Sequence, residues 1–125
     1  MKIFRPWLHT ARIADLFLLY PAIAVVIWGE LAASEPKLIE NANDKLLHFI
    51  AYFGLAAMAA MGFKARRTVI LACLGLIVLG GVLEIIQGFI GRDMSLYDEV
   101  ANGAGVLVGG LSGWIGASLL RRLAD

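Results

Sequence analysis

The chain has 125 residues, of which 60% are hydrophobic and only 17% are charged. Its mean hydropathy of +0.79 is far above that of soluble globular domains, which argues against a water-soluble enzyme or binding domain. The formal net charge is +1 and no basic stripe with interleaved aromatic residues occurs, so nothing favours nucleic acid as a partner. The composition therefore predicts an integral membrane protein.

Four apolar windows follow one another along the chain, at residues 16–34, 46–63, 68–90 and 100–120. Each has about the twenty residues that a helix rising roughly 1.5 Å per residue needs to cross a hydrocarbon core about 30 Å thick. None alternates polar and apolar residues as a barrel strand would. Little chain lies outside the windows, so we predict one domain over residues 1–125, an all-α bundle of four transmembrane helices.

The basic residues predict how the helices are oriented. Eight of the eleven lysines and arginines lie at alternate ends of the windows, at positions 2, 5, 12, 64, 66, 67, 121 and 122. By the positive-inside rule, we expect cytoplasmic termini in a bacterial cytoplasmic (inner) membrane. The first window is long and lacks a good cleavage site, which favours a retained signal anchor. Residues 2–12 before it are expected to anchor at the membrane interface.

Polar residues inside the last three windows, or at the start of two of them, recur at one depth. Ionisable groups within a membrane are costly and usually face the bundle interior or a wet cavity. Their convergence predicts a polar site in the outward-facing half of the bundle. Helical spacing places seven side chains at this level: Asp44, His48, Tyr52, Glu84, Gln87, Asp98 and Asn102.

Structural roles are the alternative for several of these residues. Asp98 follows Ser95 at the spacing of a capping box, so starting the fourth helix is an equally weighted role. Glu84 is harder to explain in this way, because a bare carboxylate in lipid costs at least several kcal/mol. The structural alternative for Glu84 is an ion pair with His48 or Arg92.

Glycine recurs every four residues in the fourth window, at Gly105, Gly109 and Gly113. This spacing lets helix backbones approach closely and predicts packing within the bundle or in a homodimer.

Metal chemistry has little support from residue spacing. Cys73 is the only cysteine and lies in the middle of the third window, so neither a disulfide nor a cysteine metal site is expected. One histidine with scattered carboxylates lacks a diagnostic ligand spacing. We therefore predict no metal ion and no other cofactor.

Two stretches, DKLLHFIAY (residues 44–52) and LEIIQGFIGRDMSLYDEVANGAG (residues 83–105), resemble the VanZ-like family. Its pattern is Asp-Lys-x-x-His-Phe-x-x-Tyr, then Glu-x-x-Gln, an Arg, and Asp-x-x-x-Asn before a glycine-rich helix. The resemblance covers about residues 16 to 120. It implies a small membrane protein of a family named for reduced susceptibility to teicoplanin, a lipid-tailed glycopeptide, and it implies no mechanism. The matching positions are Asp44, Lys45, His48, Phe49, Tyr52, Glu84, Gln87, Arg92, Asp98 and Asn102.

Three functions remain open on these residues. The first is binding of an amphiphile at the outer leaflet, with Lys45 and Arg92 facing an anionic head group and the other matched polar residues lining the site. A membrane lipid, a lipid-linked envelope precursor or a lipoglycopeptide would be the partner. The second is an accessory subunit that docks through its glycines on a copy of itself or on a larger membrane complex. The third is an intramembrane enzyme, with or without a metal, in which Glu84 or Asp98 works as acid or base with His48.

Overall fold

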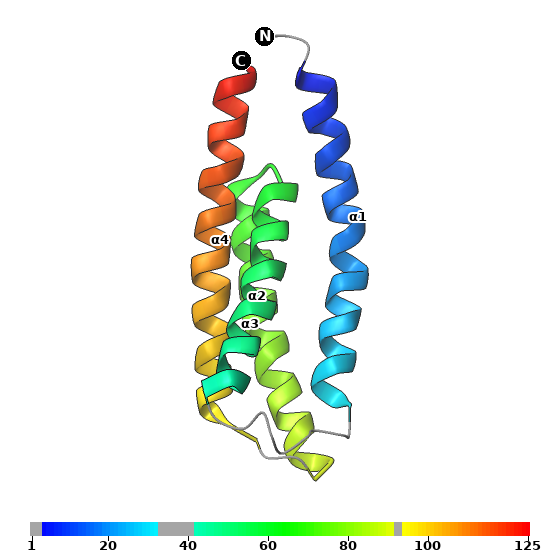
Figure 1. Cartoon of the computed structure of the whole chain (residues 1–125), viewed down its shortest axis with the longest axis vertical. Helices are drawn as coiled ribbons and strands as arrows, with labels where there is room; N and C mark the ends of the chain where they lie inside the picture. Colours follow the sequence, from blue (N-terminus) through cyan, green and yellow to red (C-terminus); the bar gives the residue numbers. More distant parts are fainter. Residues whose placement is uncertain (1–3, 33–41, 92–93) are drawn as a thin grey trace.

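The computed structural model describes residues 4–32, 42–91 and 94–125, and this part of the chain is almost entirely helical. Its elements are α1 (Phe4–Leu31), α2 (Ala42–Gly62), α3 (Arg66–Phe89) and α4 (Leu96–Ala124). The four helices lie side by side along the long axis, with the start of α1 and the end of α4 at one end of the bundle (Figure 1). We call this end the terminal end and the opposite end the loop end. The prediction of an all-α bundle of four helices is confirmed.

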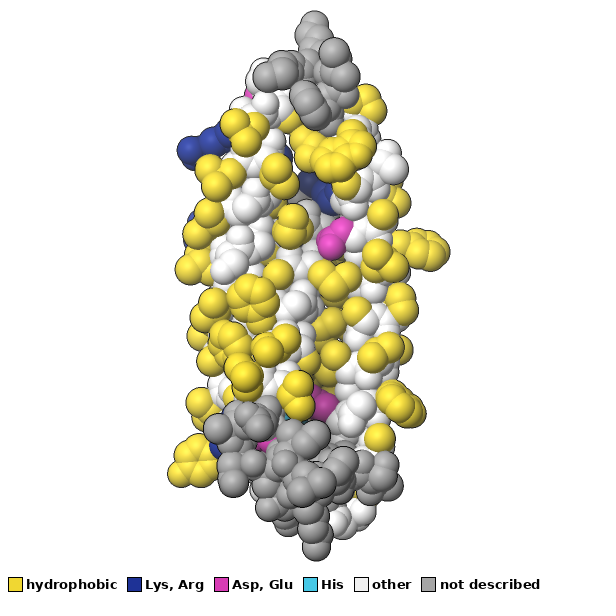
Figure 2. Space-filling view, viewed as in Figure 1, with side chains coloured by type: hydrophobic (Ala, Val, Ile, Leu, Met, Phe, Trp, Pro, Cys, Tyr) yellow, Lys and Arg dark blue, Asp and Glu magenta, His cyan; other side chains and the backbone are white. Residues whose placement is uncertain are grey.

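All four helices are long and apolar enough to cross a membrane. The candidate spans are Pro6–Leu31, Asp44–Gly62, Arg66–Phe89 and Leu96–Ala124. Figure 2 shows a face of the bundle covered mainly by hydrophobic side chains. Such an exterior suits contact with lipid tails, as expected for a multi-pass membrane protein.

Helix α1 begins well before the predicted window. It starts at Phe4 and continues through Pro21, so residues 4–12 belong to the long helix and do not form a separate interfacial segment. Pro6 is tolerated because the amides of the first helical turn have no partner within the helix. The Thr10 hydroxyl donates to the Pro6 carbonyl at 3.0 Å, the i−4 bond that threonine commonly makes within a helix. The helix ends at Leu31, and predicted positions 33–34 lie outside the described residues.

The connection between α3 and α4 shows clear start and stop chemistry. Gly91, just after α3, has φ of 83°, a backbone conformation that glycine adopts without steric cost. Ser95 is the N-cap of α4, and its side chain accepts from the Asp98 amide at 3.4 Å. Asp98 and Glu99 place negative charge at the positive end of the α4 dipole. These residues therefore fix where α4 begins.

Helices α2 and α4 pack backbone against backbone along the glycines of α4. A Cβ atom at Gly109 would stand 2.7 Å from the Phe53 Cα, and one at Gly113 would stand 2.6 Å from the Ala57 carbonyl oxygen. A Cβ at Gly105 would overlap the Phe49 carbonyl oxygen. We call this contact of Gly105, Gly109 and Gly113 with α2 the glycine seam.

Helix α1 packs more loosely than the other three. Leu19 is the only α1 residue that is buried, considering the described side chains from Pro6 to Leu31. A cavity of about 530 Å³ lies at the terminal end between α1, the end of α2 and α4. Its walls carry Arg12, Asp15, Lys64 and Arg121 among apolar side chains. The firm core of the bundle is therefore formed mostly by α2, α3 and α4.

Candidate functional site

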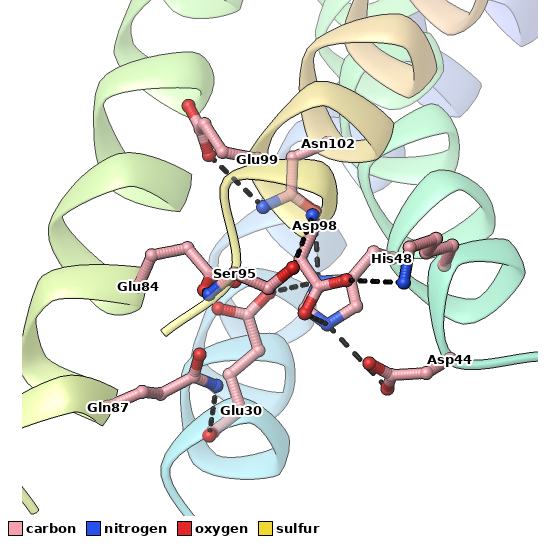
Figure 3. A network of polar contacts seen from close by, with 10 residues as sticks. Glu30, Asp44, His48, Glu84, Gln87, Ser95, Asp98, Glu99 and Asn102 are labelled. Carbon is pink, nitrogen blue, oxygen red and sulfur yellow. Dashed lines mark hydrogen bonds and ion pairs between the residues drawn. The ribbon is translucent and has the colours of Figure 1, made fainter. Parts of the chain in front are cut away.

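Polar side chains from all four helices meet at the loop end (Figure 3). Six of them are at most 9% exposed, namely His48, Tyr52, Glu84, Gln87, Asp98 and Asn102. We define the polar cluster as the nine residues labelled in Figure 3 together with Lys45, which contacts Asp98, and the buried Tyr52. Its members are Glu30, Asp44, Lys45, His48, Tyr52, Glu84, Gln87, Ser95, Asp98, Glu99 and Asn102.

His48 lies at the centre of the cluster, close to four other polar side chains. Its Nδ1 atom is 3.0 Å from Asn102 Oδ1 and 3.5 Å from Glu30 Oε1. Its Nε2 atom is 3.8 Å from both Asp44 Oδ1 and Asp98 Oδ2. One imidazole thereby joins α2 with α1 and α4.

The orientation of the His48 ring follows from the groups behind it. Asn102 donates from Nδ2 to Glu99 Oε2 at 3.2 Å, so its carbonyl oxygen is the atom turned toward His48. An amide oxygen can only accept, and His48 Nδ1 must therefore carry the hydrogen. In the neutral ring, this tautomer leaves the Nε2 lone pair pointing toward Asp44 and Asp98 (Figure 3).

Close packing at Gly80 makes room for this arrangement. A Cβ atom there would stand 2.6 Å from Glu99 Oε2 and 2.9 Å from Asn102 Nδ2. Glycine at this position lets α3 approach the two side chains that orient His48.

Glu84 contacts the start of α4 and not the histidine. Its Oε2 atom accepts a hydrogen bond from the Ser95 amide at 3.0 Å. The carboxylate thereby satisfies a free amide at the N-cap of α4 and fastens α3 to that helix. The proposed ion pair with His48 does not occur among the contacts of the described residues, and Arg92 lies outside them. Glu84 Oε1 is buried and accepts no hydrogen bond within the described part of the chain.

Two further contacts hold the edges of the cluster. Gln87 donates from Nε2 to the Glu30 carbonyl at 2.7 Å and thereby ties α3 to the last turn of α1. Lys45 Nζ is 3.7 Å from Asp98 Oδ1, and the Lys45 side chain is 42% exposed. This ammonium group therefore stands at the rim of the cluster.

Tyr52 lies on the side of the cluster that adjoins the apolar core. Its side chain is 0% exposed, and its hydroxyl has no hydrogen-bond partner within residues 4–32, 42–91 and 94–125. Below it, the core becomes apolar through Leu55, Ala56 and their neighbours.

Sequence reasoning anticipated three helices at this site, and the structure adds a fourth. Glu30 of α1 and Glu99 of α4 were not among the predicted site residues, yet both contact the groups around His48. Two signals pointed to them. Glu30 is the one acidic residue in the first apolar window, and Glu99 precedes Asn102 by three positions, which puts both on one helix face.

Comparisons with known proteins do not add to this picture. No protein-family model matches the chain, and neither the curated proteins nor the solved structures contain a match. The geometry of the polar cluster is therefore the structural basis for a functional proposal.

Proposed function

We propose that this chain is a VanZ-like integral membrane protein whose polar cluster binds the cationic head group of an amphiphile at the outer leaflet of a bacterial cytoplasmic membrane. The observation that carries the proposal is the charge of the cluster. Within the described residues, the cluster holds the carboxylates of Asp44, Glu84, Asp98 and Glu99 but a single ammonium group, that of Lys45, which lies 3.7 Å from Asp98. Buried charges of one sign require a partner of the other sign.

A cationic head group fits this charge better than the anionic one expected from the sequence. Lys45 already faces Asp98. Its side chain is partly exposed at the rim, so it does not supply a positive charge to the carboxylates deeper in the cluster. Arg92, the other cation of that expectation, lies outside the described residues. A protonated amine has three donors, which suits carboxylate oxygens such as the buried Oε1 of Glu84.

The apolar part of the ligand has a surface at the same end of the bundle. Phe89 is 87% exposed and Leu96 is 78% exposed, one on each side of the α3 to α4 connection. A hydrocarbon chain lying against these side chains would leave its head group at the level of the cluster. Membrane lipids, lipid-linked envelope components and lipoglycopeptides that carry an amine belong to this ligand class.

The alternative of an accessory subunit that docks through its glycines is less favoured. Gly105, Gly109 and Gly113 are already covered by α2, so a partner could reach them only after α2 moves aside.

Binding of matched amphiphiles tests the proposal. The purified protein, in lipid nanodiscs, is titrated with a fluorescent alkylammonium probe and with an alkyl sulfate of the same chain length. We expect saturable binding of the alkylammonium and none of the sulfate. Glu99→Gln and Glu84→Gln should each weaken binding about tenfold, because each removes a charge and keeps an acceptor. Asp15→Asn, at the terminal end, is the control and should leave binding unchanged.

Equal binding of the sulfate, or unchanged affinity in both glutamine variants, would contradict the proposal.

The VanZ-like resemblance adds a cellular readout. Expression in a teicoplanin-sensitive bacterium should lower susceptibility, and Glu84→Gln should remove this effect at an equal membrane level.

A further inference from the structure

We propose that Asp44, His48 and Asp98 form a binding site for a divalent metal ion of the zinc type. The site goes beyond the head-group function and does not require it. It shares Asp44 and Asp98 with the head-group carboxylates, but it is argued from the geometry around His48, and zinc affinity is measured separately from alkylammonium affinity. It also departs from the expectation of no metal, which was based on spacing along the sequence alone.

The distances between the three side chains fit a shared ion. One ligand atom from each residue lies within 4.8 Å of the other two. His48 Nε2 is 3.8 Å from a carboxylate oxygen of Asp44 and 3.8 Å from one of Asp98. These separations are too long for hydrogen bonds. Two ligands at about 2.1 Å from a tetrahedral zinc ion stand roughly 3.4 Å apart, which a small side-chain adjustment provides.

Asp98 supplies an independent observation that points to a cation as ligand. Its side chain is 9% exposed, and it points into the space between His48 and Asp44 (Figure 3). Its Oδ1 atom is buried and accepts no hydrogen bond from any described residue. A carboxylate withdrawn from water in this way needs a cation or strong donors, and the nearest ammonium, Lys45, remains 3.7 Å away.

The imidazole is oriented as that of a metal ligand would be. His48 Nδ1 faces the Asn102 carbonyl oxygen, which is itself held by Glu99, so the Nε2 atom faces the two carboxylates. Histidines that bind metals usually donate their other ring N–H to an oxygen acceptor in this manner. Here the acceptor is an amide oxygen whose orientation is fixed by a second residue.

The donor set selects the kind of metal. One imidazole nitrogen with two carboxylates suits zinc and similar first-row divalent ions, whereas calcium and magnesium favour sites made entirely of oxygen. Asp44 is in the first turn of α2 and its side chain is 30% exposed, so it can turn toward an ion that enters from the loop end.

Lys45 gives the proposal its most specific prediction. The ammonium group and a metal ion compete for the same Asp98 carboxylate. Lys45→Gln should therefore tighten zinc binding by roughly tenfold, because a competing positive charge is removed. A cluster with a purely structural role would not gain affinity for zinc from this change.

The test is calorimetric titration of the full chain, stripped with chelator and held in detergent micelles, with zinc chloride. We expect about one zinc ion per chain. His48→Ala and Asp98→Asn should each weaken binding at least a hundredfold, and Asn102→Ala should weaken it about tenfold through the freed imidazole. His9→Ala removes the only other histidine, which is exposed near the terminal end, and should leave binding unchanged.

Absence of saturable zinc binding by the wild-type chain would overturn the proposal. Wild-type affinity in folded His48→Ala and Asp98→Asn, or loss of binding in His9→Ala, would do the same. If His48→Ala and Asp98→Asn fail to fold, the zinc affinities of Lys45→Gln and of the more exposed Asp44→Asn test the proposal. Tighter zinc binding by Lys45→Gln together with weaker zinc binding by Asp44→Asn supports the site. Unchanged affinity in both variants contradicts it.

Discussion

The glycine seam and helix α1 show two different ways of joining a helix to this bundle. Along the seam, α4 touches the backbone of α2, and side chains larger than hydrogen have no space. Helix α1 buries only Leu19 among its described side chains, and a cavity separates its first half from α4. Yet α1 still contributes Glu30 to the polar cluster.

This difference suggests how the polar cluster is built. His48, Asp98 and Asn102 sit on the two helices that are held most tightly, so their mutual geometry is set by a stiff scaffold. Glu30 comes from the helix that is held least tightly, and a side chain of α3, Gln87, ties it in place. We infer that α1 is the wall of the site that can move most easily.

The largest effect should come from a substitution in the seam. Gly109→Leu forces a side chain against Phe53, where even a Cβ would stand 2.7 Å from the Cα atom. We expect a loss of about 3 kcal/mol or more in the free energy of unfolding, measured by detergent-denaturant titration with helical circular dichroism. Gly75→Leu is the matched control, because nothing lies within 4 Å of a Cβ at Gly75. Similar losses in both variants would show that the seam is not tightly packed.

An intermediate effect on stability should follow from removing the hydrogen bond between Glu84 of α3 and the Ser95 amide at the start of α4. Glu84→Ala leaves the Ser95 amide without its acceptor in a partly buried place. We expect a loss of about 1–3 kcal/mol in the free energy of unfolding. Glu84→Gln keeps an oxygen for Ser95 and should retain most of the stability, measured in the same titration. Equal losses would mean that the charge, and not the hydrogen bond, holds α3 there.

The smallest effect should come from α1. Leu19→Ala removes a side chain that is 5% exposed, and we expect a loss of about 1 kcal/mol, because lipid tails replace part of the lost contact. Leu18→Ala, whose side chain is 60% exposed, is the same change on the outer surface and should be nearly neutral. A loss for Leu19→Ala as large as that for Gly109→Leu would remove the distinction between α1 and the seam.

Much of the site could be predicted because it depends on local spacing. Asp44, His48 and Tyr52 share one face of α2 through the helical period, and Ser95 caps α4 three residues before Asp98, as the capping pattern indicated. The approximate level of Glu84 followed from counting turns along α3. These inferences needed only short stretches of sequence.

The parts that sequence missed depend on contacts between distant segments. Glu30 reaches His48 only because α1 packs against α2 in one particular register, which no local pattern specifies. The partner of Glu84 is a backbone amide, that of Ser95, and every residue except proline offers such a donor. The residue types in the sequence therefore cannot identify the Ser95 amide as the partner of Glu84. The early start of α1 was missed because polar residues such as His9 and Arg12 lower the hydropathy of its first turns.

The central claim is that the polar cluster at the loop end binds a positively charged ligand. The most direct measurement is the affinity of the alkylammonium probe for the wild-type chain and for the double variant Glu84→Gln, Glu99→Gln in the same nanodiscs. We predict saturable binding to the wild type and an affinity at least thirtyfold weaker in the double variant, with both proteins equally folded. Equal affinities would contradict the account.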